Sequence, residues 1–213
     1  MRACLVICAA LVGASARAEA EPTSGLYFSQ SLGIGRARGD LAPMVGNAMR
    51  TRASIGARVR WLAIEPWITS DLQTARDGAL QGIVGGEPAA GRSDLSYYGV
   101  DVKLIAPLVR ADNAVIESYV RGGGSIVEAN GALDGYGGHA LGVGAGVQLT
   151  GRVRALGFLW APLFLIKKGP KVSGSLFLDQ GFEFVTLRSM STTTPLTSRV
   201  GHVTLGFAVG TRF

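Results

Sequence analysis

The sequence contains little cysteine, little histidine and no long hydrophobic run, and each of these shortages excludes a class of protein. Both cysteines, Cys4 and Cys8, lie within the first ten residues. The longest apolar run beyond them, Ala155 to Ile166, is shorter than the about 20 residues that a transmembrane helix needs. The two histidines, His139 and His202, lie far apart in the chain and offer no metal-ligand spacing. The sequence therefore predicts no helical membrane protein, and no metal or cofactor is expected.

The first 20 residues have the pattern of a secretory signal peptide. Arg2 supplies a positive charge, Leu5 to Gly13 form a short apolar stretch, and small residues with Ala-x-Ala spacing end at Ala18 and Ala20. We therefore expect residues 1–20 to be removed on export and residues 21–213 to form the mature domain. Because both cysteines are removed with the signal, that domain has no disulfide and must be stabilised by a full core or by a membrane.

The composition excludes further classes. The 31 glycines follow no fixed period and 47% of the residues are hydrophobic, which argues against a collagen-like or a disordered chain. The formal net charge is +6. Its cations are scattered along the chain rather than clustered, so we expect no nucleic-acid partner and read the basic balance as suited to contact with anionic lipid.

Apolar and polar side chains alternate along the mature chain with a period of two residues, which places them on opposite faces of β-strands. The pattern is clearest from Gly138 to Thr150, where apolar residues alternate mostly with glycines. The same alternation occurs in residues 25–35, 50–61, 62–73, 95–106 and 114–127. In the first of these segments, Gln30 is the single polar residue on the apolar face.

The character of the two faces favours a membrane barrel over a water-soluble sandwich. The apolar face is continuous over about 10 residues, whereas the other face combines glycines with charges. Long polar segments at 36–49, 73–94, 128–137 and 188–199 alternate with short connections near residues 61–62, 108–113 and 151. Outer-membrane barrels have this pattern, with apolar residues toward lipid, long loops outside the cell and short turns in the periplasm.

We predict an all-β fold, an antiparallel transmembrane β-barrel of eight strands. Residues 153–166 and 172–187 can both form strands, which together with 200–213 would give nine, whereas bacterial barrels have an even number. We therefore assign residues 152–171, whose central part is apolar on both faces, to an insertion on the periplasmic side, and residues 172–187 to the seventh strand. A ten-stranded barrel with a short strand near residues 80–84 is the alternative.

Two segments resemble those of known outer-membrane barrels. The segment Tyr119-Val120-Arg121-Gly122-Gly123-Gly124 resembles the Tyr-Val-Arg-Gly-Gly strand common in small barrels of the OmpA, OmpX and OmpW type. The final segment resembles the terminal signal recognised by the barrel assembly machinery. Its apolar face consists of Val203, Leu205, Phe207, Val209 and Phe213. The resemblance implies the outer membrane of a Gram-negative bacterium, contact with outer-membrane lipid, and periplasmic chaperones and the assembly machinery as partners during biogenesis.

Charged residues on the polar face form the candidate functional set. Side chains fill the interior of an eight-stranded barrel, so charges there must be paired and hydrogen-bonded. We expect six cations and six anions to form a network of ion pairs rather than an ion path. The cations are Arg52, Arg58, Arg60, Lys103, Arg121 and Arg212, and the anions are Glu65, Asp71, Asp101, Glu117, Asp179 and Glu183.

The sequence favours a structural or surface-exposed, porin-like barrel with a charge-filled lumen, four extracellular loops and no catalysis of its own. It does not specify a surface ligand. The alternative is an OmpW-like passive channel for small or hydrophobic molecules. A lipid A-modifying enzyme would need a histidine close to a serine, such as Ser125 or Ser198, and no motif of those enzymes is evident. No glycine-rich segment ends a strand and opens a helix, so no nucleotide site is expected.

The signal-peptide assignment can be tested on protein isolated from membranes. We expect the N-terminus at Glu19 or Glu21, following cleavage after Ala18 or Ala20. Mass spectrometry of the intact chain, together with N-terminal sequencing, measures this directly. An intact Met1 in the membrane-isolated protein would contradict both the assignment and the predicted export.

Overall fold

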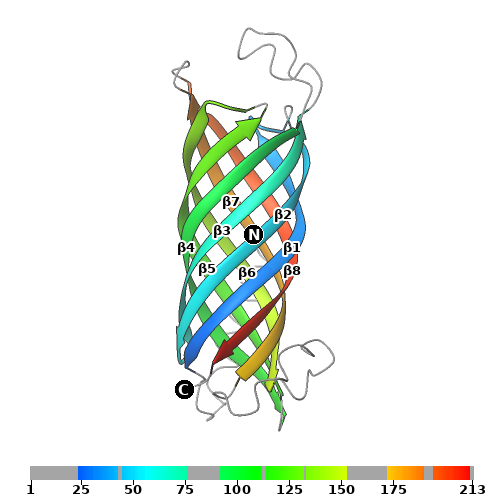
Figure 1. The fold of residues 1–213 in the computed structure, drawn as a ribbon, viewed down its shortest axis with the longest axis vertical. Helices are drawn as coiled ribbons and strands as arrows, with labels where there is room; N and C mark the ends of the chain where they lie inside the picture. Colours follow the sequence, from blue (N-terminus) through cyan, green and yellow to red (C-terminus); the bar gives the residue numbers. More distant parts are fainter. Residues whose placement is uncertain are drawn as a thin grey trace, which may run out of the picture.

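Eight antiparallel strands form one sheet that closes on itself, and each strand pairs with its neighbours in sequence. The computed structural model describes residues 24–42, 45–75, 92–111, 114–131, 133–152, 172–189 and 194–211. The strands are β1 (Gly25–Gly39), β2 (Val45–Val59), β3 (Leu62–Ala75), β4 (Arg92–Ala111), β5 (Ala114–Gly131), β6 (Tyr136–Arg152), β7 (Val172–Ser189) and β8 (Leu196–Thr211). Pairing of β1 with β8 closes the barrel, and β1 begins at the end where β8 finishes (Figure 1).

The structure confirms the eight-stranded antiparallel architecture. β3 pairs directly with β4, and β6 pairs directly with β7. The closed sheet therefore has no position for a further strand between either pair. β7 begins at Val172, where the sequence predicts the seventh strand. The signal peptide, the alternative strand near residues 80–84 and nearly all of the insertion predicted at 152–171 lie outside the described residues.

The polarity of the barrel wall is the reverse of that in a water-soluble protein. On β8, Leu205 is 64% exposed, whereas the adjacent Thr204 is only 4% exposed. No helix in the described part of the chain is long and apolar enough to cross a membrane. Large hydrophobic side chains are exposed on all eight strands and include Phe28, Ile34, Ile55, Ile64, Val100, Ile126, Leu141, Leu178 and Leu205. A band of this kind needs lipid around it, and it defines a transmembrane barrel.

Several strands extend further than the sequence indicates. The segment 36–49, predicted as a long loop, contains the end of β1 and the start of β2, and the segment 128–137 contains the end of β5 and the start of β6. Arg36 and Arg38 point outward while Ala37 is buried. The alternation thus continues beyond the apolar band with polar outward residues. From the sequence alone, such polar residues are predicted to form a loop, although in the structure their backbone is still paired with the neighbouring strand.

The lumen is not polar along its whole length, which corrects the simple division into an apolar wall and a polar interior. At the end of the barrel opposite the start of β1 and the end of β8, inward side chains form a buried hydrophobic cluster. Its members include Leu41, Trp67, Leu95, Tyr97, Val127, Leu133, Tyr136, Val185, Leu187, Leu196 and Val200. The strands project beyond the lipid at this end, and an apolar core inside them stabilises the projecting part as it would in a water-soluble protein.

Substitution of a lipid-facing residue tests the inverted polarity. An arginine in place of Leu205 would lie in the apolar band, and we expect it to lower the free energy of unfolding by about 2–4 kcal/mol. Ser96→Arg is the control, because Ser96 points outward on β4 beyond the exposed Tyr98 and opposite Glu128. There the expected change is at most about 1 kcal/mol. Urea unfolding of each variant in lipid vesicles measures the change in the free energy of unfolding. Equal effects of the two substitutions would contradict the position assigned to the apolar band.

Candidate functional site

Most charged side chains of the lumen lie together in one layer, held by alternate positions of six strands. β2, β3, β4, β5, β7 and β8 contribute to it. Inward positions alternate with lipid-facing ones, so each strand supplies its charges at spacings of two residues or multiples of two. All six predicted carboxylates lie inside the lumen, and each is within ion-pair distance of at least one cation.

Arg121 on β5 joins three strands across the lumen. Its Nη1 donates to Asp101 Oδ2 on β4 at 2.8 Å, and its Nη2 donates to Asp179 Oδ1 on β7 at 2.9 Å. Its Nε donates to Asp179 Oδ2 at 3.0 Å, which makes the contact with Asp179 bidentate. His202 Nε2 on β8 lies 2.7 Å from Arg121 Nη2. A Cβ at position 181 would lie 2.9 Å from the same Nη2 atom, so Gly181 leaves the room that this arrangement needs.

Glu65 on β3 is linked to Arg121 through Arg52 and Asp101, and it adds Lys103 to the network of ion pairs. Its Oε2 lies 2.5 Å from Lys103 Nζ, and its Oε1 accepts from Arg52 Nη2 at 3.2 Å. Arg52 also donates to Asp101 Oδ2 at 2.9 Å, and its guanidinium lies 4.4 Å from the centre of the Trp67 ring. Two cations therefore share one carboxylate, while one arginine bridges two carboxylates.

A separate pair lies near the end of the barrel where β1 begins and β8 finishes. Arg58 Nη2 donates to Glu117 Oε1 at 2.7 Å, and Arg58 Nη1 donates to Glu117 Oε2 at 3.0 Å. Gln148 and Thr150 on β6 also donate to Glu117 Oε2, at 2.7 and 3.3 Å. Every oxygen of this carboxylate thus has a donor, as a buried charge requires.

Sequence reasoning missed Arg50, which belongs to the network. This side chain is 1% exposed, donates to Asp71 Oδ2 at 3.2 Å and forms an ion pair with Glu183. Its position has the same parity as Arg52 on β2, so the alternation itself contained the signal. Sequence reasoning also missed His202, which lies inside the lumen, 3.5 Å from Asp179 Oδ1.

Arg60 does not belong to the network, which corrects its predicted place in the lumen. β2 ends at Val59, and the chain reverses through Arg60 and Trp61 before β3 begins. Arg60 is exposed and has a φ of 56°, because the tight turn requires a left-handed backbone at this position. Arg212 lies outside the described residues.

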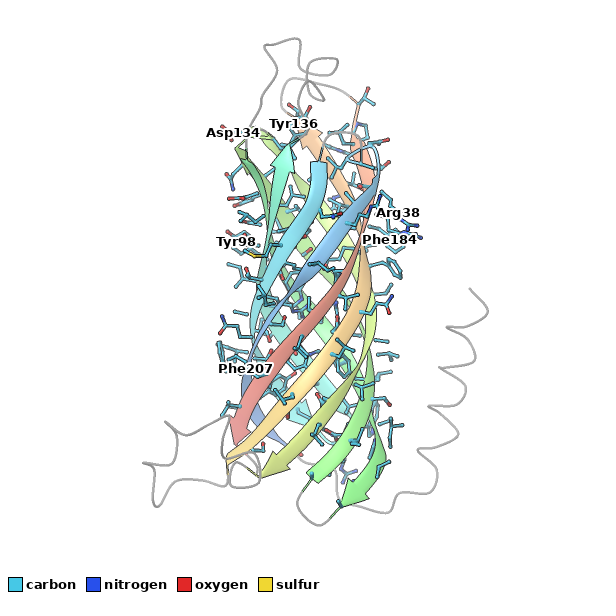
Figure 2. All side chains as sticks on the ribbon, turned by 90° about the vertical axis from the view of Figure 1, so that its right-hand side faces the viewer. Arg38, Tyr98, Asp134, Tyr136, Phe184 and Phe207 are labelled. Carbon is cyan, nitrogen blue, oxygen red and sulfur yellow. The ribbon has the colours of Figure 1, made fainter. Side chains whose placement is uncertain are left out.

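The predicted assembly signal falls on one face of β8. Val203 and Leu205 are exposed on the outer wall, and Phe207 and Val209 follow on the same face. Figure 2 shows Phe207 projecting outward from the lower half of the barrel. Phe213 lies outside the described residues, and the role of this face in assembly stays a prediction.

The histidines and serines considered for catalysis do not form a common site among the described residues. His139 is exposed on the outer wall of β6, whereas His202 is buried in the lumen. Ser198 Oγ donates to the carbonyl oxygen of Arg38 at 2.6 Å. Within the described part of the chain, no group of three or more His, Cys, Asp or Glu side chains could hold a metal ion.

Little space is left among the charges. A cavity of about 10 Å³ adjoins Arg50, Arg121, Asp179 and His202, and this is about the volume that one water molecule needs. Nearer the start of β1, a larger pocket of about 60 Å³ lies between Tyr27, Arg58, Lys103, Gln148 and Phe177. The described lumen thus contains a large apolar cluster, then a dense ionic layer, and then this pocket beside a second, smaller apolar cluster.

Together, the closed sheet of eight strands, the apolar outer wall and the paired charges inside have the architecture of the small outer-membrane β-barrels. No protein-family model matches the sequence, and no curated protein matches it. The assignment of the fold rests on the strand pairing and side-chain polarity of the protein itself.

Several solved bacterial proteins have a similar arrangement of strands. Neisserial surface protein A is 16% identical, with 91% of this chain and all of that chain covered and a TM-score of 0.47. The attachment invasion locus protein Ail of Yersinia pestis is 14% identical, with the same coverage and a TM-score of 0.39. The outer membrane protein AlkL is 11% identical, with 92% and 93% covered and a TM-score of 0.35.

Removal of the central arginine tests whether the ion pairs stabilise the barrel. Arg121→Met keeps much of the side-chain volume but deprives Asp101 and Asp179 of their shared donor. Loss of one partner of a buried pair costs about 3–5 kcal/mol, so we expect a decrease in the free energy of unfolding of this order, smaller if water enters. Arg60→Met in the exposed turn should change it by no more than about 0.5 kcal/mol. Urea unfolding in vesicles distinguishes the two, and an Arg121→Met variant as stable as the parent would contradict a stabilising network.

Proposed function

We propose that the protein is a closed structural barrel of the bacterial outer membrane that holds its extracellular connections at the cell surface and performs no chemistry of its own. The observation that carries this proposal is the ionic layer. Arg50, Arg52, Arg58, Lys103 and Arg121 each have a carboxylate partner, and the central cavity has room for about one water molecule.

A closed lumen suits a scaffold better than a pathway. A conducting pore presents an open column of water, and a selective pore presents a ring of one charge sign. Here opposite charges alternate across the lumen, and the hydrophobic cluster fills the lumen next to them along the barrel axis. Opening a path would require several ion pairs to break and the cluster to rearrange. A rigid barrel of this kind positions the segments between its strands, which is where outer-membrane proteins bind their partners.

Electrical recording tests the closed lumen. We expect the folded mature protein in planar lipid bilayers to show no stable conductance above the baseline. Retention of the heat-modifiable, folded band on gel electrophoresis of the same sample is the control for correct folding, and an open porin added to the same bilayer is the control for insertion. A large, steady conductance of the unmodified protein would contradict the scaffold and favour the passive channel.

A further inference from the structure

Three neighbouring arginines on the outer faces of β1 and β8 have no carboxylate partner among the described residues. Arg36 and Arg38 point outward from β1, and Arg199 points outward from β8. We call these three residues the arginine patch. In the described part of the chain, none of them forms an ion pair with a carboxylate. Asp40, which follows β1, instead accepts hydrogen bonds from the backbone and hydroxyl of Thr197 at 2.7 and 3.1 Å.

Two members of the patch are held against each other by the sheet. Arg38 and Arg199 are directly opposite in the pairing of β1 with β8, and both point outward. Side chains in this relation have Cβ atoms about 4.5–5.5 Å apart, and two like charges there are destabilising. Arg36 lies two residues from Arg38 on the same face, so the guanidinium groups of both can reach the same space outside the wall. An anion placed between the guanidinium groups would convert this repulsion into attraction.

Aromatic rings adjoin the patch on the neighbouring strand. The guanidinium of Arg199 lies 4.9 Å from the centre of the Phe182 ring, which holds it against the wall. Phe184 is directly opposite Arg199 and is 51% exposed. Figure 2 shows Arg38 and Phe184 projecting outward at neighbouring positions in the upper half of the barrel. The surface therefore combines cations with apolar area, as a lipid-binding surface requires.

The position of the patch indicates which part of a lipid it meets. On β1 the exposed apolar residues extend from Leu26 to Ile34, about the length of strand that crosses a hydrocarbon layer. The arginines follow immediately, where lipid headgroups begin. The other side of the barrel differs, because Asp94 on β4 and Glu128 on β5 point outward beyond the apolar band. At this end of the described barrel, outward positive charge lies on β1 and β8 and on the adjacent β7, where Arg188 is also exposed.

We propose that the arginine patch binds the phosphate groups of an anionic lipid headgroup, whose acyl chains lie along the apolar wall below it. Guanidinium groups bind phosphate oxygens through paired hydrogen bonds. The patch lies at the end of the barrel opposite the start of β1 and the end of β8, so in the proposed outer membrane it faces the outer leaflet. The inference rests on the proposed membrane location but not on the closed lumen, so conductance bears on the lumen alone.

Stability in two membranes tests whether the patch needs an anion. In vesicles of phosphatidylcholine, Arg38→Gln should leave the urea midpoint unchanged or raise it, because it removes a like-charge contact. In phosphatidylcholine vesicles that contain lipid A, the same variant should unfold at lower urea than the parent. Arg60→Gln, in the turn at the opposite end, should show no such reversal. An arginine without a ligand would give the same difference from the parent in both membranes, which would overturn the proposal.

Direct binding identifies the ligand. Native mass spectrometry of the folded mature chain, titrated in detergent with lipid A, should give a dissociation constant at least about tenfold weaker for Arg38→Gln/Arg199→Gln than for the parent, since each arginine contributes about fivefold. Arg60→Gln should bind like the parent, and phosphatidylcholine should bind weakly to all. Binding by the double variant within twofold of the parent, or equal loss in Arg60→Gln, would overturn the proposal. Displacement of the lipid by millimolar inorganic phosphate would do so as well, because it would indicate a site for a soluble anion.

Discussion

A backbone that crosses lipid finds no water to satisfy its N–H and C=O groups, so every strand needs a neighbour on both sides. Pairing of β1 with β8 meets this requirement for the whole sheet. Closure with eight strands then determines how wide the interior is, and at that width side chains fill it. The alternation of each strand sends half of its side chains to lipid and the other half into this narrow space. Small inward residues such as Gly181 are needed because large ones such as Arg121 and His202 occupy the same cross-section.

The narrow interior also explains why its charges occur as a network. A carboxylate removed from water is costly unless donors surround it, and one partner rarely supplies enough of them. Asp101 and Glu65 each accept from two cations, and Arg121 and Arg52 each bridge two carboxylates. Sharing of this kind places two cations beside one carboxylate, which balances its charge more fully than an isolated pair would. The hydrophobic cluster above the ionic layer follows a different rule, since it lies inside strands that leave the lipid, where apolar burial against water becomes available again.

Alternation and turn spacing were enough to predict the antiparallel barrel and the beginning of β7, because the inverted polarity repeats every two residues in each strand. The number of strands also required the rule that bacterial barrels have an even number, since alternation alone gave nine. They could not predict which charges meet. Arg50 and Glu183 are far apart in the chain, and only the register around the closed sheet brings them together. Arg60 was misplaced because a tight turn interrupts the alternation two residues earlier than the pattern indicates. The end of β1 and the start of β2 were predicted as a loop, because outward residues beyond the apolar band are polar whether or not the backbone is paired.

Arginine has opposite surroundings on the two sides of the same wall. In the lumen, Arg50, Arg52, Arg58 and Arg121 each contact a carboxylate of the chain. On the outer wall, pairing of β1 with β8 places Arg38 against Arg199, and no carboxylate of the described residues forms an ion pair with either. Screening by water and salt reduces the repulsion but leaves two adjacent cations, of which Arg199 lies against the ring of Phe182, just beyond the apolar band. The chain itself supplies the counter-charge inside the barrel, and we propose that outside it the counter-charge comes from the lipid headgroups.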